Sequence, residues 1–114
     1  MTTITLYRPV NQHELKLIEA GGWRAFPPRL PEQPIFYPVL NEEYAIQITC
    51  EWNAPAFGEG YVVKFDIDKN YFETFEIQTV GLDHFQELWV PAEEIDIFNS
   101  HIVAPITVTH SFKN

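Results

Sequence analysis

A proline-rich stretch at residues 26–45 places the strongest constraint on how this chain folds. It contains five of the nine prolines. Each proline lacks a backbone N–H donor and fixes its own φ angle, so the stretch forms neither a central strand nor the interior of a helix. It also carries apolar side chains that a solvated linker would leave exposed, namely Phe26, Leu30, Ile35, Phe36, Tyr37, Val39 and Leu40. We therefore predict a stiff, partly buried loop that lines a cleft and includes a short extended segment at 35–37.

Length and composition indicate one α+β domain spanning residues 1–114. The chain has 114 residues, of which 46% are hydrophobic and 15% aromatic, which is ample material for a core. No apolar run approaches the ~20 residues of a membrane helix, and no secretion-signal pattern is present at the N-terminus. We expect a cytoplasmic protein with no membrane partner. The single cysteine, Cys50, excludes an intrachain disulfide and a Cys-based zinc site, so we expect no metal. Burial as a small apolar residue is the favoured role for Cys50, with a catalytic thiol as the alternative.

The charge is distributed unevenly along the chain. Residues 1–30 hold four basic and two acidic side chains, a balance of +2, whereas residues 31–114 hold three basic and fourteen acidic ones, a balance of −11. An acidic body repels phosphate backbones, so we expect no nucleic-acid partner and no measurable affinity for duplex DNA at physiological salt. All three arginines, Arg8, Arg24 and Arg29, lie before or within the proline-rich stretch. They either converge on a small anion such as pyrophosphate or are scattered over the surface.

Periodicity predicts strands and helices in the first half of the chain. Residues 3–8 alternate as a strand that Pro9 ends. A helix begins at Asn11, whose spacing to Glu14 gives a capping-box pattern, and closes at 21–22.

A second helix is predicted at 42–52 with Asn41 as its cap, followed by a loop at 53–60. Its apolar face contains Ala45, Ile48, Thr49 and Trp52.

The second half changes to the two-residue period of strands. Alternation predicts strands at 61–67, 75–79 and 84–90, with a turn at 81–83 ending the second of them. A short helix from Pro91 to about Asn99 and a last strand at 102–109, interrupted by Pro105, follow. Asp66 and Asp68 fall on the polar face of the first of these strands, where solvation is favoured over metal binding. The chain therefore reads as an α+β fold, a mostly antiparallel sheet with two to three short helices.

One carboxylate stands out among these strands. Glu87 shares a strand face with the aromatic side chains of Phe85 and Trp89. Burying a carboxylate there is costly unless it is paired or lies at a cleft. Glu87 is therefore either an exposed charge with aromatics beside it or part of a site.

Several motifs carry a family resemblance. The chain resembles a small bacterial family of uncharacterised proteins labelled ADP-ribosylation/crystallin-J-type. The resemblance covers most of the chain, through residues 6–10 (LYRPV), 26–31 (FPPRLP), 35–45 (IFYPVLNEEYA) and 87–94 (ELWVPAEE).

A more distant similarity is to the ADP-ribosyltransferase fold. Members of that fold carry, in chain order, an Arg or His on a first strand, an aromatic or Ser/Thr on a second strand beside a helix, and a catalytic Glu on a late strand. Tyr7-Arg8, Phe36-Tyr37 and Glu87 occupy these places in the same order. Arginine-specific members place Glu or Gln two residues before the catalytic Glu, where this chain has Phe85.

This similarity implies NAD as the ligand and assigns a role to each residue. Glu87 would be catalytic and stabilise the positive charge that builds on the ribose as nicotinamide leaves. Arg8, Tyr37, Arg29 and Tyr7 would bind the nucleotide, with Tyr37 stacked on nicotinamide and residues 26–34 forming a wall. Two alternatives remain, a nucleotide-binding protein without catalysis and an acidic protein-binding module of the immunity or inhibitor type. A site would gather Arg8, Tyr37 and Glu87 in one pocket, whereas a binding module would display acids and aromatics on a convex face.

Overall fold

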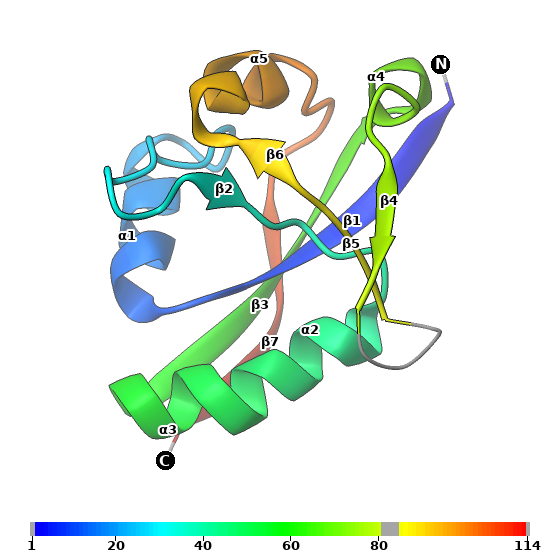
Figure 1. Cartoon of the computed structure of the whole chain (residues 1–114). Helices are drawn as coiled ribbons and strands as arrows, with labels where there is room; N and C mark the ends of the chain where they lie inside the picture. Colours follow the sequence, from blue (N-terminus) through cyan, green and yellow to red (C-terminus); the bar gives the residue numbers. More distant parts are fainter. Residues whose placement is uncertain (1, 81–84, 114) are drawn as a thin grey trace.

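The structure is a computed structural model that describes residues 2–80 and 85–113, and these form an α+β fold (Figure 1). Its strands are β1 (Thr3–Val10), β2 (Ile35–Phe36), β3 (Glu59–Asp68), β4 (Ile77–Thr79), β5 (Gln86–Leu88), β6 (Val90–Pro91) and β7 (Thr107–Lys113). Its helices are α1 (Gln12–Ala20), α2 (Glu42–Ile48), the π-helical turn η1 (Thr49–Asn53), α3 (Ala54–Phe57), α4 (Lys69–Phe72), the 3₁₀ turn η2 (Ala92–Glu94) and α5 (Ile95–Ser100).

Three long strands form the main sheet, in the order β1-β3-β7. All paired strands run antiparallel, as the sequence predicts, but β2-β6 and β4-β5 form two further small ladders instead of joining one sheet. The prediction that Pro9 ends the first strand is wrong, because Pro9 pairs with Val62 and β1 continues to Val10. Proline is tolerated here because β1 is the edge strand of the sheet. On the side of Pro9 away from β3, no strand of this sheet needs the backbone N–H that proline lacks.

The sheet separates two apolar cores, because successive strand residues point to opposite faces. On one face, Leu6 of β1 and Phe65 of β3 pack with Ile18 of α1 and Phe98 of α5. On the other face, a smaller cluster contains Val39, Ala45 and Val62, with Tyr7 and Tyr44 packed against it. The helix segment from α2 to α3 therefore covers one face, and α1 and α5 cover the other (Figure 1).

The first helix begins as the sequence predicts, but its capping box is only half formed. The Asn11 side chain accepts a hydrogen bond from the Glu14 backbone N–H at 2.8 Å. The Glu14 carboxylate does not return to the cap and bonds Arg8 instead. At the other end Gly22 takes a left-handed φ of 74°, a conformation that glycine adopts readily.

The second helix is longer than predicted, and its expected surface is partly wrong. It begins at Glu42 as predicted, but Asn41 does not cap it, since the Asn41 side chain accepts the Gln86 backbone N–H. The predicted loop at 53–60 is instead the end of the helix and the start of β3. The wider turn η1 changes the phase of the helix. Trp52 is consequently 69% exposed instead of packed, and Cys50 is exposed instead of buried.

The remaining strands differ from their predicted ranges: β4 covers only the end of the predicted 75–79, and β7 extends to Lys113, beyond the predicted end at 109. The predicted strand at 84–90 appears as β5 and β6, while its first residue and the predicted turn at 81–83 lie outside the described residues. Pro105 interrupts the last strand as predicted, since Ile102 before it forms only an isolated β-bridge and β7 starts after it at Thr107. The prediction of two to three helices missed α4, which begins because the Asp68 side chain accepts the Tyr71 backbone N–H.

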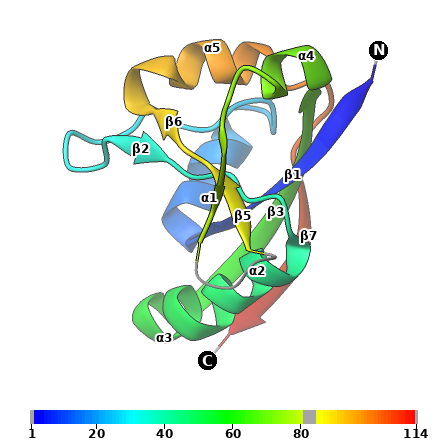
Figure 2. The same ribbon diagram turned by 45° about the vertical axis from the view of Figure 1, so that its right-hand side comes forward.

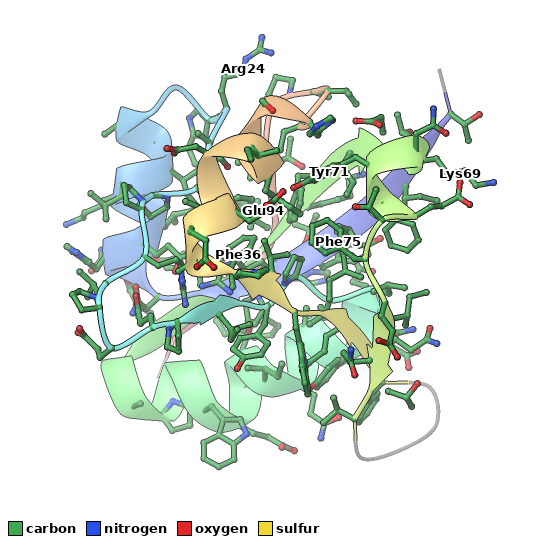
Figure 3. All side chains as sticks on the ribbon, turned by 45° about the horizontal axis from the view of Figure 1, so that its top comes forward. Arg24, Phe36, Lys69, Tyr71, Phe75 and Glu94 are labelled. Carbon is green, nitrogen blue, oxygen red and sulfur yellow. The ribbon has the colours of Figure 1, made fainter. Side chains whose placement is uncertain are left out.

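A polar network joins α4 to α5 on the face opposite α2. The Tyr71 hydroxyl donates to Glu94 at 2.8 Å (both labelled in Figure 3), and its ring stacks on His101 with centroids 3.8 Å apart. His101 in turn contacts Asp68 at 2.6 Å. Asp66 bonds Thr5 on the neighbouring strand. Both aspartates of the expected solvated face thus have protein partners.

Among the described helices, none is long and apolar enough to cross a lipid bilayer.

Candidate functional site

The chain after β2 brings three distant segments together. Val39 exchanges backbone hydrogen bonds with Tyr7 at 2.9 and 2.8 Å, and residues 38 and 40 bond to β5 through the Leu88 N–H and the Gln86 carbonyl. Figures 1 and 2 show this segment passing between β1 and β5 before it enters α2. Neighbouring strands lie about 4.8 Å apart, so this arrangement brings the ends of β1, β2 and β5 to one place.

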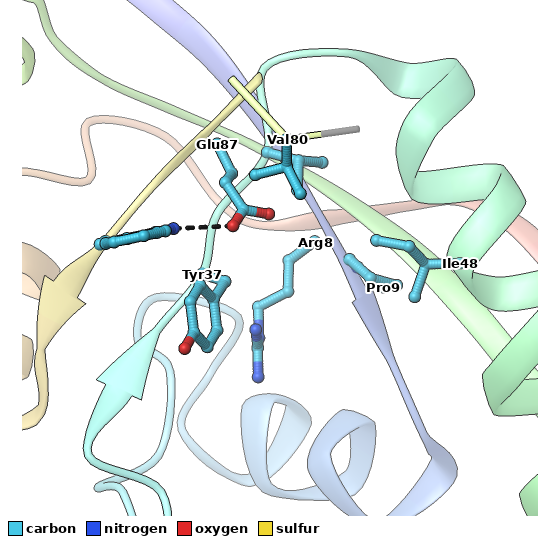
Figure 4. Close-up of a pocket in the computed structure, with 8 residues that line it drawn as sticks. Arg8, Pro9, Tyr37, Ile48, Val80 and Glu87 are labelled. Atoms are coloured by element: carbon cyan, nitrogen blue, oxygen red, sulfur yellow. Dashed lines mark hydrogen bonds between the residues drawn. The ribbon is translucent and has the colours of Figure 1, made fainter. Parts of the chain in front are cut away.

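A pocket opens at this junction and holds three of the predicted site residues. Its volume is about 440 Å³, within the range typical of small-molecule sites. Arg8, Tyr37 and Glu87 all line it (Figure 4). The other lining residues are Pro9, Val39, Ile48, Val80 and Trp89. Residues 26–34 do not line this pocket, so the predicted proline-rich wall is replaced by α2, β5 and the residues beside β4 and β5.

Glu87 is a buried carboxylate held by neutral donors. It is 8% exposed. One oxygen accepts the Trp89 indole N–H at 2.7 Å, and the other accepts the Tyr44 hydroxyl at 3.1 Å. Within the described residues, no Lys, Arg or His nitrogen forms an ion pair with it. Its negative charge is therefore held in place without being neutralised.

Tyr44 supports this carboxylate from the α2 side. Burial, followed by the charge of Glu87 and their hydrogen bond, raises the pKa of Tyr44, so its hydroxyl remains a donor at neutral pH. Its ring stacks on Phe85 with centroids 4.7 Å apart and planes 5° apart. The sequence pattern missed Tyr44 as a site residue, because nothing local indicates that a helix residue meets a strand residue 43 positions later.

Arg8 is buried at the opposite end of the pocket. Its guanidinium points away from Glu87 and toward α1 (Figure 4). There it forms a two-point ion pair with Glu14, with Nε at 2.6 Å and the second nitrogen at 2.9 Å from the carboxylate oxygens. The same guanidinium lies 4.6 Å from the centroid of the Phe36 ring. The pocket thus has a negative end at Glu87 and an arginine at the other end.

Two half-exposed aromatic rings border the space between these ends. Tyr37 is 42% and Trp89 48% exposed, and their centroids lie 6.5 Å apart in an edge-to-face arrangement. Such rings offer flat apolar surfaces on which a planar ligand group can stack.

The other two predicted ligand residues lie outside this pocket. Tyr7 does not line it, because strand alternation turns its ring toward α2, where it lines a separate hollow with Leu40 and Asn41. Arg29 lies in the proline-rich loop and lines a small hollow against α1, although its guanidinium is also close to Phe36, at 5.6 Å.

A second hollow adjoins the pocket. It shares Ile48 and Val80 with the first and has a volume of about 390 Å³. Its remaining lining residues are Tyr44, Gln47, Glu51, Trp52 and Phe85. The two hollows together give an open groove between α2 and the β4–β5 hairpin. In the part of the chain that the structure describes, no three His, Cys, Asp or Glu side chains gather closely enough to hold a metal ion.

Comparison with known proteins adds no relative. The chain matches no protein-family model, no curated protein and no solved structure at a significant level.

Proposed function

We propose that this protein handles NAD or ADP-ribose in the pocket between β1, β5 and α2, in the manner of an ADP-ribosyltransferase. The observation that carries the proposal is the meeting of Arg8, Tyr37 and Glu87 around one pocket, although 79 positions separate the first residue from the last. The similarity to ADP-ribosyltransferases points to the same three residues from their order along the chain. A concave site favours this function over a convex binding face.

The charge layout of the pocket suits this ligand. NAD carries a positive nicotinamide ring at one end and a negative pyrophosphate in the middle. The uncompensated carboxylate of Glu87 attracts the positive end, and the Tyr37 and Trp89 rings offer stacking surfaces for the planar nicotinamide. The remaining N–H groups of Arg8 are donors for ribose or phosphate oxygens.

The reaction needs a fixed negative charge and little else from the protein. The bond between nicotinamide and ribose C1′ breaks, its electron pair leaves with nicotinamide, and positive charge develops on the ribose. Glu87 stabilises that charge, and a nucleophilic acceptor then bonds to C1′ and loses its proton. Tyr44 and Trp89 hold the Glu87 carboxylate in position before the reaction begins.

The test measures NAD binding by calorimetry and nicotinamide release by chromatography. The Glu87→Gln variant keeps the shape of the side chain and removes its charge. We expect it to bind NAD and to lose about 100- to 1000-fold in the rate of nicotinamide release, the typical effect of removing one charge-stabilising group. Glu93→Gln, an exposed carboxylate in η2, is the matched control and retains the wild-type rate. The proposal fails if the wild type binds neither NAD nor ADP-ribose. Unchanged release in Glu87→Gln would remove Glu87 from the catalytic role.

A second candidate function is an acidic protein-binding module. The observation that favours it is the 69% exposed Trp52 beside the exposed Glu51, in a chain of net charge −9. Exposed tryptophans are common anchors of protein interfaces. Titration with a lysine-rich peptide tests this function, since a module would bind it in a salt-sensitive way and Trp52→Ala would weaken the complex. Tight NAD binding that Trp52→Ala leaves unchanged would favour the first function.

A further inference from the structure

Two arginines from distant parts of the chain share one aromatic ring. The guanidinium carbons of Arg8 and Arg29 lie 4.6 and 5.6 Å from the centroid of the Phe36 ring, which is fully buried. Arg8 is 9% exposed, and Arg29 is partly buried in the proline-rich loop. Bringing two positive charges together away from water is unfavourable unless negative charge balances them.

The protein supplies only part of that balance. Glu14 uses both of its carboxylate oxygens on Arg8. Arg29 has no ion-pair partner among the described residues, and its hydrogen bond goes to the neutral carbonyl of Ile35 at 3.2 Å. The Arg29 Nε is buried and has no hydrogen-bond partner. Folded proteins rarely bury a donor without a partner, so this N–H, like the charge of Arg29, lacks compensation within the described residues.

The electrostatics of Arg29 agree with this imbalance. Burial first, and then the positive charge of Arg8, lower the pKa of Arg29 from its usual value. Glu14 and Tyr37 act in the opposite direction but less strongly. Glu14 thus acts on both guanidiniums but pairs only with Arg8, and Arg29 has no ion-pair partner among the described residues.

We propose that Arg8, at one end of the pocket, and Arg29, which lies outside the pocket, together hold a phosphate or pyrophosphate group. Guanidinium groups bind phosphate oxygens through paired N–H donors, and Arg29 has donors to spare. Its loop contains Pro27, Pro28 and Pro31, whose fixed φ angles limit the motion of the backbone that carries it. The loop backbone therefore loses little conformational entropy when an anion binds.

This inference extends the proposed function and rests on it for the identity of the ligand. The nicotinamide end of NAD would lie toward Glu87, and the pyrophosphate would reach the arginines. Free inorganic pyrophosphate presents the same chemistry, so the anion site can be tested without NAD.

The experiment is a calorimetric titration of wild type and variants with inorganic pyrophosphate, ADP-ribose and nicotinamide separately. We expect pyrophosphate to bind the wild type, and Arg29→Gln to weaken it by about 10- to 100-fold, the effect of losing a hydrogen bond to a charged group. Arg29→Lys keeps the charge and retains part of the affinity. Arg24→Gln removes an exposed arginine outside the site and is the matched control.

A stability measurement separates ligand binding from a structural role. Because Arg29 carries an unmatched charge, we expect Arg29→Gln to leave the melting temperature unchanged or raise it, whereas loss of a structural arginine lowers it.

The anion site is refuted if pyrophosphate does not bind the wild type, or if Arg29→Gln binds it as Arg24→Gln does. Binding of ADP-ribose that is insensitive to Arg29→Gln would refute the anion site and leave the proposed function standing. If the protein binds pyrophosphate but neither ADP-ribose nor NAD, the anion site stands and the proposed function is refuted.

Discussion

The Glu14→Gln variant should lower stability and raise anion affinity at the same time. Glu14 neutralises Arg8 through two short hydrogen bonds, and the two side chains are only 16% and 11% exposed. Exposed ion pairs are worth about 0–1 kcal/mol, whereas breaking a buried pair costs about 3–5 kcal/mol. Glutamine keeps one acceptor oxygen for Arg8, so we expect an intermediate loss of about 2 kcal/mol. For a domain of this size that corresponds to a fall of roughly 8 °C in melting temperature.

The same substitution removes the negative charge that opposes an anion at Arg8 and Arg29. One unit charge at roughly 10 Å and an effective dielectric constant of 20 changes affinity by about tenfold. Pyrophosphate should therefore bind Glu14→Gln about tenfold more tightly than it binds wild type.

Thermal unfolding and pyrophosphate titration, both in low-salt buffer, measure the two effects. Glu19→Gln is the control, because Glu19 is an exposed carboxylate of the same helix. A melting temperature equal to that of Glu19→Gln would show that the Arg8–Glu14 pair has only the strength of a surface pair. Weaker pyrophosphate binding in Glu14→Gln would contradict the placement of the anion at these arginines.

Two further predictions concern stability away from the arginines. Burial first, and then the hydrogen bond to Glu94, raise the pKa of Tyr71. The contribution of the protonated Tyr71 to folding stability is therefore complete below the unfolded-state pKa of about 10 and is lost as the pH rises above that value. The urea midpoint should therefore fall as the pH rises from about 9 to about 11, and Tyr71→Phe should reduce this fall; an equal fall in both proteins would contradict it. Leu88 is fully buried in the larger core, so Leu88→Ala should cost about 2–5 kcal/mol in urea unfolding, and a loss below about 1 kcal/mol would show that the core can close around the gap.

Local patterns in the sequence were sufficient to predict most of the helices and strands. The alternation at 61–67 predicted the central part of β3, and the cap at Asn11 predicted the start of α1. Both follow from interactions within a few residues, which a sequence displays directly. The buried Leu88 and Val90 beside the Glu87 face also follow the predicted alternation.

Failures occurred where a distant partner competed with a local pattern. Asn41 was predicted as a helix cap, but its side chain bonds the Gln86 N–H, 45 positions away. Glu14 leaves the capping box for Arg8 because an ion pair is stronger than a neutral hydrogen bond. In the second helix, the turn at η1 moved Trp52 from the predicted packed face into solvent.

The sequence alone determined the α+β class and the antiparallel pairing, because periodicity is a local property. Residue chemistry also singled out Glu87 and the arginines, whereas Tyr37 became a candidate through the similarity to the ADP-ribosyltransferase fold. Only the tertiary structure decided that Arg8, Tyr37 and Glu87 share a pocket, that Tyr7 faces away from it, and that Tyr44 and Trp89 hold the carboxylate. The unmatched charge of Arg29 likewise required the fold. The physical reason is that the site depends on the segment at 37–40 pairing with both β1 and β5, and such long-range hydrogen bonds leave no periodic mark on the chain.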